Sequence, residues 1–522
     1  MFFAHCAEIT TDKEITKIFM ANWQIPNFLE LRDNRLFIDG VSAVELAEKY
    51  GTPLFVFSES RIRHNIARLQ KAQEVIDCPL KVCYAAKANS TMAILRVVKE
   101  SGCDLEVNSG GELHKALKIG FRGEQIIFNG TSKEIWEIEN AINASIYAIQ
   151  VDSLYELSLI EETARRLNKR ANVSLRLVPE IETKTHSGLQ TALLTSKFGM
   201  MPDEALKAFR EYKNSPFLNL CGIHLHIGSQ NSEAAPYSDA LRALFENLEI
   251  IYRETGLKLS HLNLGGGFPV NYLRDNSHAA DFPQEQRVIF SADYEPSDAI
   301  REAWRAVKEA AAATDTANLL ENITLLIEPG RSVIADAGIC LTKVRNVKAR
   351  PVEKSGVWSL ESEVLSRESE DEKKPFELQT PDSRLQTPDS RLRTDFWLLT
   401  DAGFNILLSM ETYKWYYHLI SAERAGEAHE FPYKVAGPLC DGGDVYFDIE
   451  GKKLLPDYRL LPEAVKPGEV LALLNCGAYS VAQMFQYNGR FLPAIVLTKK
   501  SGEVELIRRR DSFEDLYNND LW

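Results

Sequence analysis

Between about residue 80 and residue 330 the sequence alternates short apolar runs with longer amphipathic stretches. The stretches place apolar residues three and four positions apart, as in a helix with one buried face, and the short runs are typical of buried strands. Eight strands alternating with helices favour a parallel sheet, and eight is the number that closes a (β/α)8 barrel. A doubly wound open sheet is the alternative, because periodicity does not show closure. The predicted strands cover residues 81–86, 103–107, 125–128, 146–151, 172–178, 221–226, 260–264 and 324–328.

After residue 330 the pattern of apolar and polar residues changes. Short runs rich in β-forming residues, such as "TDFWLLTDAG" and "FLPAIVLTKK", are separated by glycine and proline, which favours a mainly β, Greek-key-like barrel as a second domain. The runs "RLFIDG" and "PLFVFS" near the N-terminus look strand-like and are expected to join it. We predict an α/β protein in which residues 1–57 contribute strands to the β domain, residues 58–330 form the (β/α)8 barrel and residues 331–522 form the β domain.

Residues 353–394 fit neither domain. They contain the charged run "ESEVLSRESEDEKK" and then the heptad "LQTPDSR" twice in tandem. The repeat is too short and too polar to build a core. We therefore predict a disordered insertion between two strands rather than a regulatory docking site.

The composition is that of a globular enzyme and disfavours several classes of function. A formal net charge of −14 argues against nucleic acid or a membrane surface as a partner. No apolar run is long enough to span a bilayer, and the first residues lack the pattern of a secretory signal. The eight cysteines form no CxxC pair, so neither a zinc ribbon nor a redox motif is supported. We expect a reducing, cytoplasmic setting.

Several unusual motifs follow predicted strands directly. Lys87 follows the first strand in "YAAKANS", while "HIGSQ" follows the sixth, "GGGFP" the seventh and "EPGR" the eighth. In a (β/α)8 barrel the active site lies at the C-terminal ends of the strands. These motifs are therefore expected to converge on one rim.

The three consecutive glycines Gly265, Gly266 and Gly267 suit a close approach of backbone N–H groups to an anion. Barrels often bind phosphate with the loops after strands seven and eight. Here strand eight is followed by Gly330 and Arg331. A phosphate site is therefore favoured over a plain loop.

Lys87, at the end of an apolar strand, has two interpretations. It could be a structural residue that pairs with a carboxylate inside the barrel. A desolvated lysine, however, has a lowered pKa and can form a Schiff base with a carbonyl. A lysine, a phosphate cradle and the carboxylate of Glu328 on one rim describe a pyridoxal phosphate (PLP) site, where Glu328 would keep the pyridine nitrogen protonated. The small neighbours Ala85, Ala86 and Ala88 would leave room for the ring.

His224 and His226 lie two positions apart, and therefore on one face of a strand, as metal-binding pairs do. A metal site would need further ligands at other strand ends, which the remaining histidines do not obviously supply. It would also leave Lys87 and the glycines unexplained. We therefore predict no metal, with His226 stacked on the cofactor and His224 as an interior residue.

Eight motifs in a fixed order resemble those of the fold-type III PLP-dependent decarboxylases, which act on diaminopimelate, ornithine, arginine and related amino acids. The resemblance runs from about residue 30 to the C-terminus, apart from the insertion, and the diaminopimelate enzymes match best. The motifs are "YAAKAN", "NSGGEL", "SKFG", "HLHIGSQ", "NLGGGFP", "EPGR", "GPLCDGGD" and "GAY".

This resemblance implies a role for each matching residue. Lys87 would hold the cofactor through its amine, with His226 stacked on the ring and Glu328 at the pyridine nitrogen. Arg331, Asp441 and Tyr479 would contact the amino-acid substrate. The phosphate would be held by Ser229, Gly265, Gly266, Gly267, Gly330, Arg331 and Tyr479.

The resemblance also implies a homodimer whose active sites are completed across the subunit interface. Cys440 and Asp441 would come from the partner subunit, and Cys440 would return a proton to the substrate carbon after carbon dioxide leaves. The alternative for Cys440, a small buried residue, is disfavoured by its setting in a loop rich in glycine, proline and aspartate.

The motifs point in two directions on the substrate. Diaminopimelate enzymes usually carry Cys-Glu where this chain has Cys440 and Asp441, and an arginine ahead of a Tyr-His pair where Met410 stands beside Glu411. A thioether does not replace an arginine clamp for a distal carboxylate, so Asp441 and Glu411 would favour a distal amine or guanidinium. We predict decarboxylation of meso-diaminopimelate to L-lysine, with ornithine, arginine, lysine or a carboxylated polyamine precursor as alternatives. The β domain and the Cys-Asp loop speak against an amino-acid racemase or a non-catalytic PLP carrier.

Overall fold

The computed structural model describes residues 23–178, 196–274, 283–353 and 392–521. Eight parallel strands close into a barrel in the order β10, β11, β12, β5, β6, β7, β8, β9. The β12–β5 pair joins the last strand of the barrel to the first. The predicted (β/α)8 barrel is confirmed, and the open doubly wound sheet is wrong. The strands are β5 (Leu80–Ala85), β6 (Asp104–Val107), β7 (Ile126–Phe128), β8 (Ala148–Val151), β9 (Ala171–Arg176), β10 (Leu218–His224), β11 (His261–Asn263) and β12 (Thr324–Ile327).

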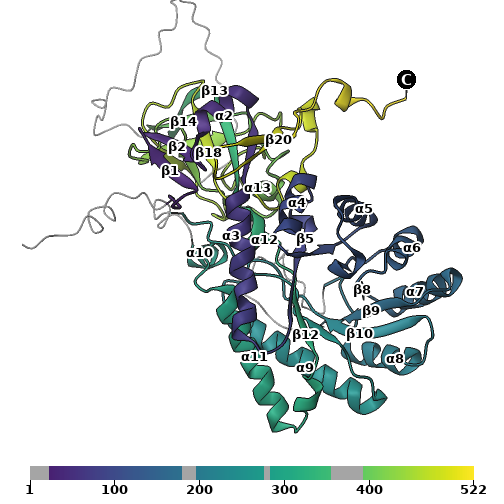
Figure 1. Cartoon of the computed structure of the whole chain (residues 1–522). Helices are drawn as coiled ribbons and strands as arrows, with labels where there is room; N and C mark the ends of the chain where they lie inside the picture. The colour runs from purple at the N-terminus through teal and green to yellow at the C-terminus, as the bar shows by residue number, and fades with distance from the viewer. Residues whose placement is uncertain (1–22, 179–195, 275–282, 354–391, 522) are drawn as a thin grey trace, which may run out of the picture.

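Amphipathic helices surround the barrel and alternate with its strands (Figure 1). Three of them begin at Ser58, Ser109 and Ser153, whose side chains accept a hydrogen bond from the backbone N–H three residues on. The helices of this region are α3 (Glu59–Gln70), α4 (Met92–Glu100), α5 (Gly110–Ile119), α6 (Ile135–Asn143), α7 (Leu154–Leu167), α8 (Pro202–Tyr212), α9 (Ala235–Thr255), α10 (Gln284–Phe290) and α11 (Pro296–Ala313).

The second domain is mainly β, as predicted. Its nine strands form one sheet with the main path β17, β16, β14, β13, β4, β19, β20, while β18 pairs with both β13 and β15. Short helices α12 (Arg331–Ile334) and α13 (Leu408–Thr412) accompany it. The strands are β4 (Leu54–Ser58), β13 (Gly338–Glu353), β14 (Leu392–Thr400), β15 (Leu419–Ser421), β16 (Phe431–Ala436), β17 (Arg459–Leu461), β18 (Val470–Leu473), β19 (Ala494–Thr498) and β20 (Val504–Arg508).

The N-terminal segment belongs spatially to this sheet. β4 lies between β13 and β19, antiparallel to the first and parallel to the second. Before it come the small sheet β1 (Leu29–Arg32), β2 (Arg35–Ile38), β3 (Val41–Ser42) and the helix α2 (Ala43–Tyr50). Their apolar side chains share a buried cluster with β4, β13 and β18. The chain therefore enters through the β domain before it builds the barrel.

β13 and β14 form a long antiparallel pair in which Glu353 lies opposite Leu392. Both residues fall inside the range predicted as an insertion, so the strands reach further than expected from each side. The remainder of that prediction, residues 354–391, lies outside the described residues. The pairing of β13 with β14 therefore extends to the last described residue on each side.

The two domains share one continuous apolar core. The β domain also contacts the barrel beside Lys87, because the backbone N–H of Tyr479 donates to the carbonyl of Ala88 at 2.8 Å. In the parts of the chain that the structure describes, no helix has both the length and the apolar character needed to cross a membrane.

Candidate active site

Lys87 stands on the rim of the barrel in a single turn, Ala86–Ala88, directly after β5. Its Nζ lies 3.4 Å from both carboxylate oxygens of Glu106, which comes from the neighbouring strand β6. The Glu106 side chain is fully buried, whereas 38% of the Lys87 side chain is exposed. The lysine therefore reaches from a buried carboxylate toward the open side of the rim.

The expected lowering of the Lys87 pKa is wrong for this arrangement. Burial alone lowers the pKa of the ammonium, but Glu106, followed by Tyr479 and Glu328, outweighs it and raises the pKa above its ordinary value of 10.5. The carboxylate pairing considered for Lys87 from the sequence is thus present. It does not replace the predicted cofactor residues, because Glu328, His226 and the glycine loop lie on the same rim.

Glu328 follows β12 and is buried, with 3% of the residue exposed. It accepts hydrogen bonds from Asn263 at 2.7 Å and from Asn129 at 2.9 Å. Burial, and then the nearby Glu106 carboxylate, raise the pKa of Glu328 from 4.5 to about 7. A cation beside Glu328, such as a protonated ring nitrogen, would relieve this excess of negative charge. The two carboxylates, Glu328 and Glu106, therefore suit a cationic aromatic ring on the rim.

His226 supplies a neutral ring on the same rim. Its Nδ1 accepts a hydrogen bond from the backbone N–H of Gly266 at 3.0 Å, so the proton of the neutral imidazole is on Nε2. Burial, and then the positive charges of Lys87 and Arg176, hold the pKa of His226 well below its ordinary value. A ring fixed by the glycine loop and free of charge can stack on a flat cofactor.

The glycine loop after β11 comes close to other backbone segments. Gly267 has φ +98°, and a Cβ on it would lie 2.7 Å from the carbonyl oxygen of Gly228 and 2.4 Å from Nδ2 of Asn231. Neither distance is tolerable for a real side chain, and the positive φ disfavours one as well. This glycine is therefore required by the fold of the rim, and the loop presents bare backbone.

Gly330 brings the end of β12 against the turn that carries Lys87. A Cβ on Gly330 would lie 3.1 Å from Cβ of Ala85, 3.2 Å from Cβ of Ala88 and 3.5 Å from the hydroxyl of Tyr479. The alanines beside Lys87 thus make room for a neighbouring backbone. The turn that carries Lys87 therefore meets Gly330 and Tyr479 at one place.

Arg331 is a buried cation at the start of α12. Its Nε donates to the Ser229 hydroxyl at 3.2 Å and its Nη1 to the Tyr272 hydroxyl at 2.9 Å. The guanidinium carbon lies 4.2 Å from the ring centre of Trp415 and 4.9 Å from that of Tyr479. Burial alone would lower the pKa of Arg331, but Tyr272 and Tyr479 outweigh burial and raise the pKa above its ordinary value, so the side chain stays charged. A phosphate or carboxylate here would find a fixed positive partner.

These contacts define what we call the rim cluster: Lys87, Glu106, His226, Glu328, Arg331 and Tyr479. Five of its members were predicted from the motifs, and the predicted Ser229 and Gly266 are hydrogen-bonded to Arg331 and His226 of the cluster. Glu106 and the amide Asn263 were missed. One signal could have found Glu106, because an acidic residue inside the short apolar strand "DLEV" is unusual unless it has a partner.

Cys440 and Asp441 lie in residues 438–444, which we call the cysteine loop. The Cys440 thiol is exposed, and its backbone N–H donates to Asn488 at 2.7 Å. Asp441 accepts from the Tyr487 hydroxyl at 3.3 Å. The hydrogen bonds described for this loop go to residues of the β domain, so the structure of one chain does not join Cys440 to the rim cluster.

The cysteine loop is nevertheless well fixed. Buried Asp444 accepts hydrogen bonds from the backbone N–H groups of Leu439 and Phe404, both at 2.8 Å. Burial raises the pKa of Asp444 to about 6. The loop thus holds an exposed thiol in a defined position.

Met410, which stands where diaminopimelate enzymes usually carry an arginine for the distal carboxylate, does not face a substrate pocket. Met410 packs in the main core with 2% of the residue exposed. Its neighbour Glu411 forms an ion pair with Lys414 at 2.9 Å. A Cβ on Gly443 would lie 3.4 Å from both a Glu411 and an Asp441 carboxylate oxygen. Asp441 of the cysteine loop and Glu411, which pairs with Lys414, therefore lie on the same side of Gly443.

His224 and His226 take separate partners. His224 is fully buried, and its Nε2 lies 3.6 Å from Glu328, whereas His226 bonds to the glycine loop. Among the described residues, no group of three or more His, Cys, Asp or Glu side chains is arranged to hold a metal ion.

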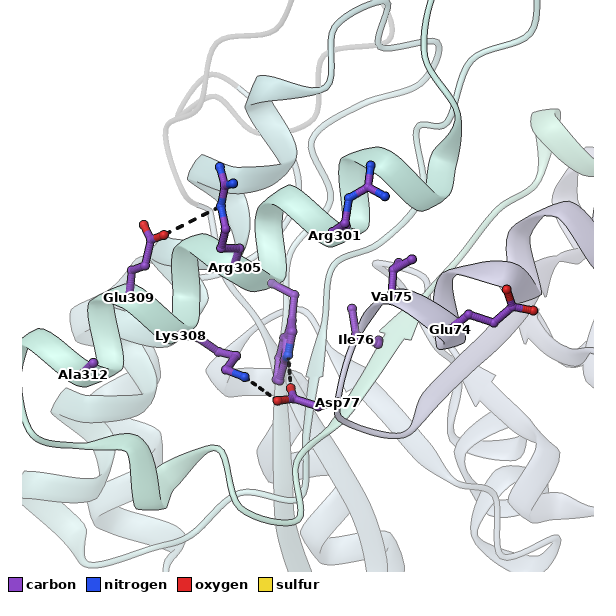
Figure 2. A pocket seen from close by; sticks show the side chains of 10 residues that line it. Glu74, Val75, Ile76, Asp77, Arg301, Arg305, Lys308, Glu309 and Ala312 are labelled. Atoms are coloured by element: carbon purple, nitrogen blue, oxygen red, sulfur yellow. Dashed lines mark hydrogen bonds and ion pairs between the residues drawn. The ribbon is translucent and has the colours of Figure 1, made fainter.

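A surface hollow of about 650 Å³ lies elsewhere, between residues 74–77 and α11. Figure 2 shows Asp77 facing Lys308 across it, and Arg305 facing Glu309 along the helix. None of the predicted site residues lines this hollow. Four of its charged side chains form two ion pairs, Asp77 with Lys308 and Arg305 with Glu309.

Comparison with known proteins identifies relatives of this architecture. Residues 60–335 match the model for "Pyridoxal-dependent decarboxylase, pyridoxal binding domain". The chain is 33% identical to a diaminopimelate decarboxylase of Methanocaldococcus jannaschii, over 94% of this chain and 96% of that protein. It is 30% identical to one of Aquifex aeolicus, over 93% and 96%. A crystal structure of the M. jannaschii enzyme in complex with L-lysine superposes with a TM-score of 0.74 at 31% identity, covering 95% of this chain and 98% of that chain.

Proposed function

The chain belongs to the pyridoxal-dependent decarboxylases, and from this premise we propose that it converts meso-diaminopimelate to L-lysine by removing one α-carboxylate. It is a PLP-dependent carboxy-lyase. The substrate is proposed because relatives named diaminopimelate decarboxylase match nearly the whole chain at 27% to 33% identity. The rim cluster is the single structural observation that carries the proposal.

The rim cluster offers PLP a complete set of partners. Bound PLP supplies an aldehyde for an amine and a ring that takes up the electrons of the broken Cα–carboxylate bond. Lys87 would hold the aldehyde carbon, His226 would lie flat on the ring and Glu328 would hold the ring nitrogen in its protonated state. The raised pKa of Glu328 supports this role, because a neighbouring cation favours its ionised form.

The phosphate would lie where bare backbone and a buried cation meet. In the loop of Gly265, Gly266 and Gly267, the first two N–H groups are donated to Asn263 and His226, so Gly267 would offer its N–H to the phosphate, and Gly330 opens the backbone beside Tyr479. Arg331 and Ser229, hydrogen-bonded to each other, supply a charge and a hydroxyl. Arg331 and Tyr479 would also orient the α-carboxylate of the substrate, which is the group that departs.

Proton return to the substrate carbon needs a group that the rim cluster does not contain. We assign it to Cys440 of a second copy of the chain in a homodimer, with Asp441 at the substrate's distal amine. The exposed thiol on a fixed loop supports this arrangement, since an acid must be placed within hydrogen-bond reach of the carbon it protonates.

A second substrate class is favoured by the acids beside the cysteine loop. Glu411 and Asp441 both lie near Gly443; Lys414 is already paired with Glu411, and Arg490 donates to the carbonyl of Pro438 in the same loop at 2.8 Å. Such a setting suits a distal amine or guanidinium, as in ornithine or arginine, better than a distal carboxylate. The lysine Lys414 would have to leave Glu411 to hold the distal carboxylate of diaminopimelate.

A substrate panel separates these possibilities. The purified protein is incubated with PLP and diaminopimelate, ornithine, arginine, lysine or a carboxylated polyamine precursor, and carbon dioxide release is measured. The proposal expects the highest kcat/KM for diaminopimelate and lysine as the product. A higher kcat/KM for a substrate without a distal carboxylate would favour the distal-amine or guanidinium class over diaminopimelate. If no substrate releases carbon dioxide, both proposals are contradicted.

A cytoplasmic location is part of the proposal. Seven cysteines in the described part of the chain are free thiols, six of them buried, which suits a reducing compartment.

A further inference from the structure

Lys87 faces a carboxylate to which the motifs assign no role. Its Nζ lies at the same distance, 3.4 Å, from Oε1 and Oε2 of Glu106. A cation placed equally between two oxygens interacts with the whole carboxylate rather than with one hydrogen-bond acceptor. The Glu106 side chain is fully buried and the Lys87 side chain partly exposed, so the lysine is the member of the pair that has room to move.

Glu106 is held in place from its other side. Nδ2 of Asn129 donates to Glu106 at 2.7 Å and to Glu328 at 2.9 Å. One amide group thus uses its two N–H donors on two buried carboxylates. Because Asn129 fixes Glu106, the carboxylate marks a fixed position beneath the rim, and Lys87 can swing toward it or away from it.

We propose that Glu106 is the positioning residue that receives the Lys87 amine each time the substrate displaces it from the cofactor, and that it holds the amine there as an ammonium. The inference rests on the proposed function, because it requires Lys87 to bind PLP. It accounts for a buried carboxylate next to a lysine that must alternate between two partners.

The exchange balances in protons and charge. The substrate nitrogen arrives as an ammonium group and loses two N–H bonds as it takes the place of Lys87, and the two electron pairs of those bonds form its two new bonds to carbon. Two N–H bonds form on the departing Lys87 nitrogen, which ends as an ammonium. Glu106 supplies the opposite charge that stabilises this product, so it favours release of the lysine.

Other charged groups face Lys87 from several elements. Glu106 (β6), Glu328 (after β12) and Tyr479 (β domain) raise the pKa of Lys87 against the effect of burial, and Arg176 (β9) lowers it. The charge of Lys87 also acts on Glu112, His224 and His226. Among the neighbours that raise the pKa of Lys87, Glu106 has the largest effect, so removing its charge should lower that pKa.

The test is the pH dependence of cofactor capture in Glu106→Gln. Full-length protein freed of cofactor is mixed with PLP, and the absorbance of the bound cofactor is followed over time. The neutral amine captures PLP, so the rate rises with pH as Lys87 loses its proton. In Glu106→Gln we expect this profile to move to lower pH by about one unit or more, with faster capture at neutral pH and a lower kcat.

Two control variants make the result specific. Asp104→Asn removes a carboxylate from the same strand β6, where its partner is Lys81, and should leave the profile unchanged. Glu106→Asp keeps the charge but withdraws it by one methylene, and should give a smaller shift. If Glu106→Gln does not fold, as judged by circular dichroism, the comparison of Glu106→Asp with wild type decides.

An unchanged capture profile in both Glu106 variants overturns the inference. Slower capture at every pH also overturns it, because Glu106 would then be the base that deprotonates Lys87. Either result leaves the proposed function intact. Only a wild-type protein that fails to capture PLP through Lys87 would contradict the proposed function itself.

Discussion

The rim cluster and the cysteine loop are both rich in glycine and both fixed by buried acids, yet they face opposite environments. Around Lys87, side chains from the barrel and the β domain close on one another. Around Cys440, buried Asp444 braces a loop whose thiol points to solvent. One chain thus brings together the residues of the proposed cofactor site, whereas the thiol that we propose as the proton donor lies exposed on a separate loop.

This difference assigns distinct tasks to the two regions. On the proposed function, the rim cluster binds and orients a cofactor within one subunit, because all of its side chains come from that subunit. On the proposed function, the cysteine loop acts only when a second copy of the chain brings it to a rim cluster. Variants of the two regions should therefore differ in the step that they abolish.

Lys87→Ala should have the largest effect. The variant should lose the absorbance of covalently bound cofactor, and turnover should fall by a factor on the order of 10⁴ or more, because the attachment point is gone. Lys81→Ala, on the strand β5 that leads to Lys87, is the matched control and should keep the absorbance, since Lys81 pairs with Asp104 away from the rim. Bound-cofactor absorbance that survives in Lys87→Ala would contradict the assignment of the anchor.

Cys440→Ala should keep the cofactor and lose proton return. We expect unchanged absorbance of bound PLP and a fall in kcat by a factor of about 10² to 10⁴, the usual contribution of a positioned acid. The measurement is carbon dioxide release together with the absorbance spectrum.

Mixed dimers check whether the cysteine acts across the interface. Coexpression of Lys87→Ala with Cys440→Ala should restore about a quarter of the wild-type activity, since half of the dimers are mixed and each has one intact site. Recovery that stays at the level of the parent variants would place both residues in the same subunit's site.

A smaller effect concerns stability without cofactor. The pKa of Glu328 is raised to about 7 in the folded chain from 4.5, so the folded state binds this proton more tightly than the unfolded state. The resulting stabilisation is present at low pH and is lost as the pH rises from about 4.5 to about 7. In thermal unfolding of the cofactor-free protein, Glu328→Gln should flatten this decline by a few degrees in Tm; the same slope in both proteins would contradict it.

The insertion should have the smallest effect. Glu353 and Leu392 face each other across the hairpin, and antiparallel strands can be joined by two residues. Replacing residues 354–391 by Asn-Gly should therefore leave kcat/KM within about twofold, since loop length costs little. A tenfold loss in kcat/KM would show that the insertion takes part in the site.

The sequence foretold those features that depend on local pattern. The eight strands were visible because each is a short apolar run, and Lys87, the glycine loop and Gly330 were visible because each follows such a run. Barrel closure could only be inferred from the strand count. The mainly β second domain was recognisable from its short strands and frequent turns.

What the sequence did not give depends on closure of the barrel. Glu106 and Glu328 lie far apart in the chain, and Asn129 joins them only because β6, β7 and β12 meet around one ring. The pKa of Lys87 is raised rather than lowered because barrel closure brings carboxylates to it, an effect that burial alone does not predict. Similarly, Met410 faces the core, which periodicity in so short a helix as α13 cannot show.

The most direct test of the account locates the cofactor on the chain. The holoenzyme is treated with borohydride, which fixes the bound cofactor to its amine, and is then digested and analysed by mass spectrometry. The account predicts a pyridoxyl group on the peptide that contains Lys87. The modification of a different lysine, or of none, would contradict it.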